Sequence, residues 1–146
     1  MVLRVVQGVQ TGEDTEDLRA FLRTLEGAPE VHETVLLACS NHGDERPTWT
    51  YVEADAHHGV ARRRCLQCAT NVYVLDSEAR WTFPHMWSCQ SCGQSIAEIA
   101  AGLSLPDGDH VEWLVLGARC CDCGRIDGLT DFVLPKVPLS QVVSGL

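Results

Sequence analysis

The spacing of apolar residues in the first third of the chain predicts a strand, a helix and a second strand. Residues 2–7 are apolar enough for a strand, and residues 11–14 carry the hydroxyl and acidic groups typical of a helix start. The apolar positions that follow at helical spacing are Leu18, Phe21, Leu22 and Leu25. A glycine and a proline then end the helix, and residues 31–38 return as a strand. We therefore expect an N-terminal β-α-β segment over residues 1–38.

The middle of the chain predicts short strands and one further helix. Residues 48–53 and 70–75 are rich in β-branched and aromatic residues, which favour strands. Residues 81–87 alternate, with three aromatic side chains and His85 on one side, and His85 is expected to be a core histidine. Residues 94–103 are predicted as a helix whose apolar face is formed by Ile96, Ile99, Ala100 and Leu103.

The last third predicts two more strands and a tail. Residues 106–109 carry a strong turn signal just before a strand over 111–116, and another strand covers 126–134. Beyond this point the apolar pattern thins and two prolines appear. Residues 135–146 are therefore expected to form a loosely packed tail with a half-turn of amphipathic helix, and a peptide that docks on another protein is the alternative.

The composition changes this picture because the chain contains eight cysteines. Seven of them and one histidine form four pairs with two residues between the members: Cys39 with His42, Cys65 with Cys68, Cys89 with Cys92, and Cys120 with Cys123. One tight turn can present both members of such a pair to one ion, and zinc completes its tetrahedron with a second pair. The pairs predict two metal sites with zinc as the expected ion, although four thiolates can also hold iron.

The residues after the pairs support metal sites over disulfide bonds. Gly43, Gly93 and Gly124 each follow a pair, where the turn under a bound thiolate commonly requires a positive φ. An even number of cysteines also permits disulfides. The start of the chain shows no export signal, however, and the thiol pool of the cytosol disfavours disulfide bonds.

Two orders of pairing are open. The nested order, which we favour, joins the second pair with the third and the first with the fourth. The sequential order joins the first with the second and the third with the fourth, and a weak internal repeat between residues 59–68 and 117–123 supports it. Cys121 lies outside the ligand spacing and is expected to be a small apolar residue that points away from the metal. A reactive thiol, or an exchange of ligand with Cys120, is the alternative.

In the nested order, residues 60–103 contain four elements in turn: a knuckle, which is the tight turn that carries one ligand pair, then a hairpin, a second knuckle and a helix. This order, with its Cys-x-x-Cys spacing, resembles a zinc-ribbon or treble-clef module. The resemblance implies an α+β protein with a small, zinc-stapled antiparallel β core over residues 39–134. The N-terminal segment over 1–38 would pack on that core, and residues 135–146 would follow as the tail.

The charge of the chain disfavours a general nucleic-acid binder. The chain has 11 Lys and Arg against 20 Asp and Glu, a net charge of −9, whereas phosphate binding requires positive charge. Arg62, Arg63 and Arg64 form the local exception and are candidates for contact with RNA, DNA or a protein partner. Trp81 and Trp87 can stack on bases. The simpler interpretation is that the arginine stems cover tryptophan faces.

The sequence does not indicate an enzyme. Two sites with four protein ligands each leave no open metal position, which is typical of structural zinc. The chain has neither a zinc-deaminase motif nor a Gly-rich phosphate loop. His57 and His58 lie in a predicted loop and are expected to face solvent, with a third metal or a replaced ligand as the alternative.

We therefore expect a non-enzymatic protein-interaction adaptor that binds two structural Zn²⁺ ions and a protein partner. The first alternative is an RNA- or DNA-associated zinc-ribbon factor that uses Arg62, Arg63 and Arg64. The second is an electron carrier, because the last two pairs are similar to the iron-binding knuckles of rubredoxins, although the proline usual in the second rubredoxin loop is missing.

The composition also bears on where the protein is found. No apolar run approaches the 18 or so residues of a membrane span, and no partner membrane is expected. Arginine is used ten times and lysine once, at Lys136, which is typical of a GC-rich genome. A bacterial, cytoplasmic protein is therefore expected.

Overall fold

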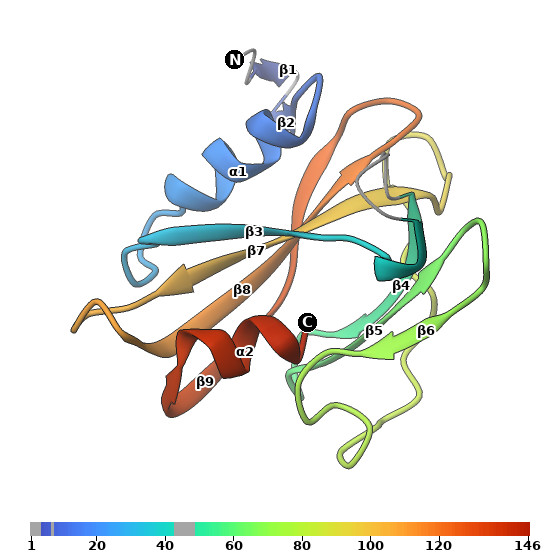
Figure 1. Cartoon of the computed structure of the whole chain (residues 1–146). Coiled ribbons are helices and arrows are strands. Elements are labelled where there is room, and N and C mark those ends of the chain that lie inside the picture. The colour runs from blue at the N-terminus through green and yellow to red at the C-terminus, as the bar shows by residue number, and fades with distance from the viewer. Residues whose placement is uncertain (1–3, 7, 43–48) are drawn as a thin grey trace.

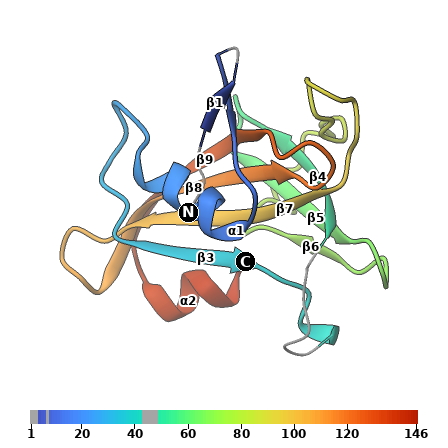
Figure 2. The same cartoon turned by 90° about the horizontal axis from the view of Figure 1, so that it is seen from above.

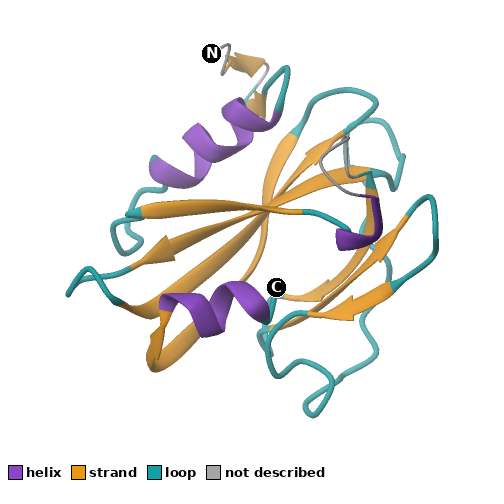
Figure 3. Ribbon diagram, in the orientation of Figure 1, coloured by secondary structure: helices purple, strands orange, loops and turns teal. Residues whose placement is uncertain are grey.

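The computed structural model describes residues 4–6, 8–42 and 49–146 (Figure 1). Antiparallel strands make up most of the regular secondary structure of these residues, and two α-helices complete the fold, as Figure 3 shows. The elements in chain order are β1 (Arg4–Val6), β2 (Val9–Thr11), α1 (Thr15–Arg23), β3 (Glu33–Leu37), the 3-10 turn η1 (Ser40–His42), β4 (Thr50–Asp55), β5 (Val60–Cys65), β6 (Asn71–Tyr73), β7 (Ala97–Ser104), β8 (His110–Cys120), β9 (Ile126–Pro138) and α2 (Leu139–Ser144).

A single seven-stranded sheet forms the centre of the molecule. Its strands lie in the order β6-β5-β4-β7-β8-β9, and β3 pairs with β7 beside the point where β4 meets it. All pairings in this sheet are antiparallel. The strands predicted over 111–116 and 126–134 are confirmed as parts of β8 and β9, and those predicted over 31–38 and 48–53 overlap β3 and β4.

The helix predicted over 94–103 is wrong, because residues 97–103 belong to β7. Every residue of β7 is buried, since the strand is covered on both faces. A strand buried on both faces shows no alternation of apolar and polar residues, so its pattern resembles that of a buried helix. Alanine and glycine at 97, 100, 101 and 102 let the layers on both sides approach it closely.

The two helices cover opposite faces of the sheet (Figures 1 and 2). Leu18 and Leu22 of α1 are fully buried in one apolar cluster, which includes Ala100 of β7. The neighbouring residues of β7 turn to the other face and pack in a second cluster with α2. Period-two alternation within β7 thus divides the core into two layers.

The N-terminal helix begins where the sequence predicts. The Asp14 carboxylate accepts a hydrogen bond from the Asp17 backbone N–H at 3.1 Å, and the Asp17 carboxylate accepts one from the Glu13 N–H at 2.7 Å. These reciprocal bonds satisfy donors at the first turn. The structure has a hairpin of β1 and β2 ahead of the helix, and these two strands form a separate sheet from β3.

The expectation of a loosely packed tail is wrong. β9 continues to Pro138, and α2 then turns back onto the core, where Val142 and Leu146 are buried. The Leu75 N–H donates to the Gly145 carbonyl at 2.8 Å, which ties the end of the chain to the loop after β6. Neither described helix is long and apolar enough to cross a membrane.

The contact between α1 and β8 makes a first prediction. A Cβ atom at Gly117 would lie 2.9 Å from the Leu22 side chain, whereas a Cβ at its cross-strand partner Gly128 would meet nothing within 4 Å. Gly117→Ala should therefore lower the free energy of unfolding by about 1–3 kcal/mol through overpacking. Gly128→Ala is the matched control and should change it little. Urea denaturation of both variants measures the difference, and equal effects would contradict this packing.

Candidate metal centres

The structure gathers the eight predicted ligands into two groups. The first centre consists of Cys39, His42, Cys65 and Cys68, and the second of Cys89, Cys92, Cys120 and Cys123. Within each centre the ligand atoms all lie within 4.8 Å of one another. No third group of this kind lies in the part of the chain that the structure describes.

This grouping is the sequential order, so the favoured nested order is wrong. The nested order required a helix over 94–103 to follow the third pair. The segment instead enters the sheet as β7, and Ala97 lies opposite Cys120 of β8. That register brings the loop of the third pair beside the turn of the fourth. The weak internal repeat corresponds to β5 and β8, each of which ends at the first cysteine of a knuckle.

The distances within the two centres follow one scheme. In each, the first ligand of one pair lies beside the second ligand of the other pair. The Sγ atoms of Cys39 and Cys68 are 3.6 Å apart, and His42 Nε2 lies 3.3 Å from Cys65 Sγ. In the second centre, the corresponding sulfur–sulfur distances are both 3.5 Å. A tetrahedral ion with metal–sulfur bonds of roughly 2.3 Å requires sulfurs about 3.8 Å apart, so both centres are close to the size of a zinc site.

The knuckle backbones explain how short turns present two ligands. In three knuckles the N–H of the residue after the second cysteine donates to the carbonyl of the first, at 2.8–3.0 Å. These residues are Ala69, Gly93 and Gly124, with φ of 60°, 78° and 80°. The positive φ predicted for Gly93 and Gly124 is confirmed, and Gly43 lies outside the described residues. Ala69 adopts the same conformation although its Cβ makes it costly there.

Sheet register places the two centres at the same end of the sheet. Thr50 of β4 lies opposite both Cys65 of β5 and Ala97 of β7, and Ala97 lies opposite Cys120 of β8. This row crosses four strands, so the two cysteines are about 14 Å apart along it. In Figure 1 the turn from β5 to β6 lies beside η1, and the turn from β8 to β9 lies beside the segment that enters β7.

Polar neighbours stabilise the thiolate form at the exposed side of the first centre. The Thr70 hydroxyl, 3.1 Å from Cys68 Sγ, is the largest influence and lowers the pKa of this thiol to about 5, with help from the Asn41 amide at 3.7 Å. Burial raises the pKa of Cys65, but nearby backbone N–H groups outweigh it and the net shift is downward. The contact with Cys65 raises the pKa of His42.

A buried arginine lies behind the first centre. Arg63 is 9% exposed, and its Nε donates to the Leu146 backbone oxygen at 2.8 Å. Burial lowers the pKa of Arg63, while the nearby thiols of Cys39 and Cys65 act in the opposite direction. A positive charge at this place stabilises thiolates in the centre.

Burial and crowding oppose ionisation at part of the second centre, although the Arg125 charge interacts with the thiols of Cys89 and Cys123. Burial, and then the neighbouring thiols, raise the pKa of Cys123 to about 12. For Cys89, burial also raises the pKa, but the backbone N–H groups of Cys92 and Ser91 outweigh it. Four thiolates this close together require a cation among them. Arg125 ties the two loops by donating to Ser91 Oγ at 2.9 Å.

Cys121 belongs to neither centre. Its backbone N–H donates to the Ile96 carbonyl at 3.0 Å, and burial raises the pKa of its thiol to about 12. A thiol with so high a pKa stays protonated and is a poor nucleophile. The structure thus agrees with the expectation that Cys121 is not a ligand, while the direction of its side chain relative to a metal stays a prediction.

Two of the three arginines proposed for nucleic-acid contact are engaged within the protein. Arg62 donates to Glu53 at 2.6 Å, and its guanidinium lies 4.8 Å from the Trp81 ring centre. Arg63 is buried, and Arg64 alone of the three is exposed. At Arg62 the simpler interpretation, an arginine that covers a tryptophan face, is therefore confirmed.

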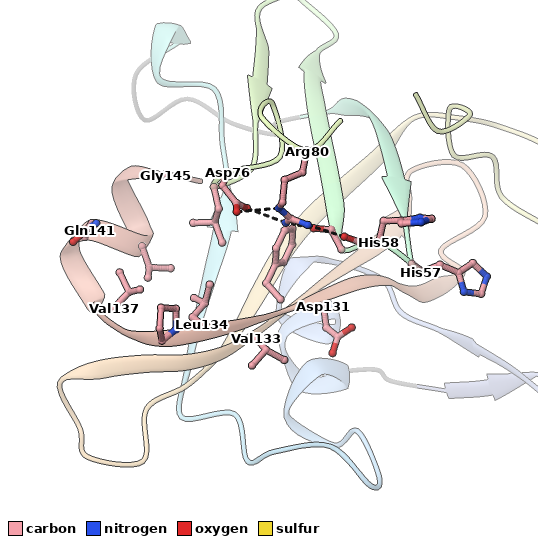
Figure 4. A pocket seen from close by; sticks show the side chains of 16 residues that line it. His57, His58, Asp76, Arg80, Asp131, Val133, Leu134, Val137, Gln141 and Gly145 are labelled. Atoms are coloured by element: carbon pink, nitrogen blue, oxygen red, sulfur yellow. Dashed lines mark hydrogen bonds and ion pairs between the residues drawn. The ribbon is translucent and has the colours of Figure 1, made fainter. Parts of the chain in front are cut away.

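A cavity lies away from both centres, between the turn from β4 to β5, β9 and α2 (Figure 4). Its volume is about 690 Å³. Arg80 directs its donors at the Asp76 carboxylate and at the carbonyls of His58 and Gly59. His57 and His58 are exposed at its rim, as predicted, and neither belongs to a metal centre.

No protein-family model, curated protein or solved structure matches this chain. The zinc-ribbon or treble-clef resemblance therefore has no support from a relative. The module expected over 60–103 is also not formed as such, because its two knuckles belong to different centres and its helix is β7.

The sequential order can be tested with Co²⁺, whose absorption spectrum distinguishes a site of four thiolates from a site of three thiolates and one imidazole. Replacing Cys65 and Cys68 together by serine removes two ligands from the first centre only. We expect one Co²⁺ per chain with a pure four-thiolate spectrum. Replacing Cys120 and Cys123 by serine is the matched variant and should leave only the spectrum of the site with the imidazole. The reverse result would restore the nested order.

Proposed function

We propose that the chain is a non-enzymatic adaptor whose fold is held by two structural Zn²⁺ ions. The observation that carries this proposal is the pair of four-ligand centres, each with its ligand atoms within 4.8 Å of one another. One centre offers three sulfurs and one imidazole nitrogen, and the other offers four sulfurs. Both sets belong to structural zinc, and the thiolates disfavour Mg²⁺ and Ca²⁺.

The ligand number supports a structural role for both ions. Four protein ligands complete a tetrahedron and leave no position open for water or substrate. The ligands of each centre also come from loops well separated in sequence, with 22 residues between His42 and Cys65 and 27 between Cys92 and Cys120. Each ion therefore cross-links two loops and adds its binding free energy to folding. This supports a scaffold protein rather than an enzyme.

Charge supports a basic protein as the partner. Seven thiolates add −7 and two Zn²⁺ ions add +4, which takes the net charge from −9 to −12. Arg62 and Arg63 are engaged within the protein, so they contribute little positive surface for phosphates. An acidic, rigid surface favours association with a positively charged protein surface and suppresses binding to bare nucleic acid.

Metal content is the direct test. Native mass spectrometry with elemental analysis should find two zinc ions per chain, and Cys121→Ser should retain both because Cys121 belongs to neither centre. Chelation should lower the melting temperature of the protein strongly. A different stoichiometry, or a melting curve that chelators leave unchanged, would contradict structural zinc. Iron in the second centre would instead favour the electron carrier.

The adaptor role requires its own measurement. The zinc-loaded protein should bind a basic protein in a nuclease-resistant complex that weakens as salt rises. Arg64→Ala should leave this complex intact, because a single exposed arginine adds little to an acidic surface. A retained species that nuclease destroys and that Arg64→Ala weakens would favour the nucleic-acid alternative.

A further inference from the structure

The loop between β6 and β7 presents an aromatic side chain to solvent. Phe83 is 83% exposed and Met86 is 47% exposed. The sequence predicted a strand over 81–87 with His85 in the core, and this is wrong: the residues form a loop, and His85 is exposed. Pro84 removes one ladder donor from this segment. Exposure of a single apolar residue is common, so it does not by itself mark a binding surface.

The backbone of Phe83 gives a second and independent observation. Its φ is +56°, in the left-handed region that bulky L residues rarely adopt. A glycine or asparagine would occupy this position with less strain. The backbone conformation therefore does not favour phenylalanine here, and its largely exposed ring meets the Trp81 ring only edge-on. Strained residues that persist tend to lie at functional sites, where the surroundings hold them in place.

Contacts on both sides hold the loop in this conformation. The Thr82 hydroxyl donates to the Asp55 carboxylate at 2.7 Å, and the Trp87 N–H donates to the Val52 carbonyl at 2.7 Å. Trp81 lies edge-on to Tyr73, with ring centres 5.2 Å apart. Its own ring centre is 6.5 Å from that of Phe83. The Phe83 ring is therefore presented by an anchored loop, so ordering it on binding costs little entropy.

The charged groups around the loop indicate the chemistry of a partner. Glu53 pairs through its backbone with Met86 and through its carboxylate with Arg62. Asp55, which binds Thr82, has His58 as its other side-chain partner. Glu53 and Asp55 thus place two carboxylates beside the one guanidinium of Arg62, and the whole chain carries −9. A partner surface with lysine or arginine around an apolar pocket complements this arrangement.

We propose that residues 81–86 are the docking element of the adaptor, and that the Phe83 ring inserts into an apolar pocket bordered by Lys or Arg on a protein partner. This inference rests on the adaptor role proposed above but uses residues outside both metal centres. Aromatic anchors that fill a pocket commonly dominate the free energy of an interface.

The test uses the zinc-loaded full chain with a photo-crosslinking phenylalanine analogue in place of Phe83. The matched control carries the same analogue in place of Val133, which is 84% exposed on β9. Crosslinking in the cells of origin should give one basic protein from position 83 and not from position 133. Equal products from both positions, or a product with nucleic acid or a second copy of the chain, would overturn the proposal.

The purified partner then allows a quantitative comparison. Phe83→Asn should weaken binding by about tenfold or more, whereas Val133→Thr should leave it within about twofold. Phe83→Asn should also keep or raise the melting temperature, because asparagine tolerates the left-handed conformation. A lower melting temperature would mean that Phe83 serves packing, and unchanged affinity would exclude the docking role.

These outcomes separate the two proposals. If Phe83→Asn leaves the partner bound while chelation releases it, the adaptor stands and the docking element fails. If the chain carries no zinc, the structural role of the metal fails, while the crosslinking result at position 83 still decides the docking element.

Discussion

The pairing of β7 with its neighbours determines where everything else lies. β7 contacts β8 along its whole length on one side, and β3 and β4 on the other, with every one of its residues buried. The same pairings set the row from Cys65 to Cys120 at one end of the sheet. A shift of one residue in the β7–β8 register would turn each side chain to the opposite face and separate the second pair of knuckles.

Electrostatics and sheet geometry support each other at the two centres. The strands bring four ligands together, yet not every thiol ionises readily there, because burial and then the neighbouring thiols raise the pKa of Cys123 to about 12. A divalent cation reverses this cost because it favours all the thiolates at once. Folding and metal binding should therefore be strongly coupled. The ends of the sheet and the ligand loops are then stabilised by the bound ions as well as by apolar packing.

The sequence shows which residues are the candidate ligands but not which pairs of ligands share one ion. The spacing of the cysteines and the glycines after them is local, so the eight ligands and the turns at Gly93 and Gly124 could be predicted. The pairing of knuckles depends on register between strands that are far apart in sequence, which no local pattern records. The sequence does not reveal β7 for a related reason: a strand covered on both faces lacks the alternation of apolar and polar residues that shows its period.

Phe83 lies in the second segment whose structure the local sequence pattern does not predict, and the cause is different from that at β7. The aromatic alternation over 81–87 is real, but Pro84 and the left-handed φ of Phe83 break the strand. In a minimally frustrated sequence, local preferences agree with the fold. At Phe83 the residue type and the backbone conformation disagree, and the contacts of Thr82 and Trp87 maintain this conformation. Such a conflict requires an advantage that the isolated chain does not show. Contact with a partner is an advantage of that kind.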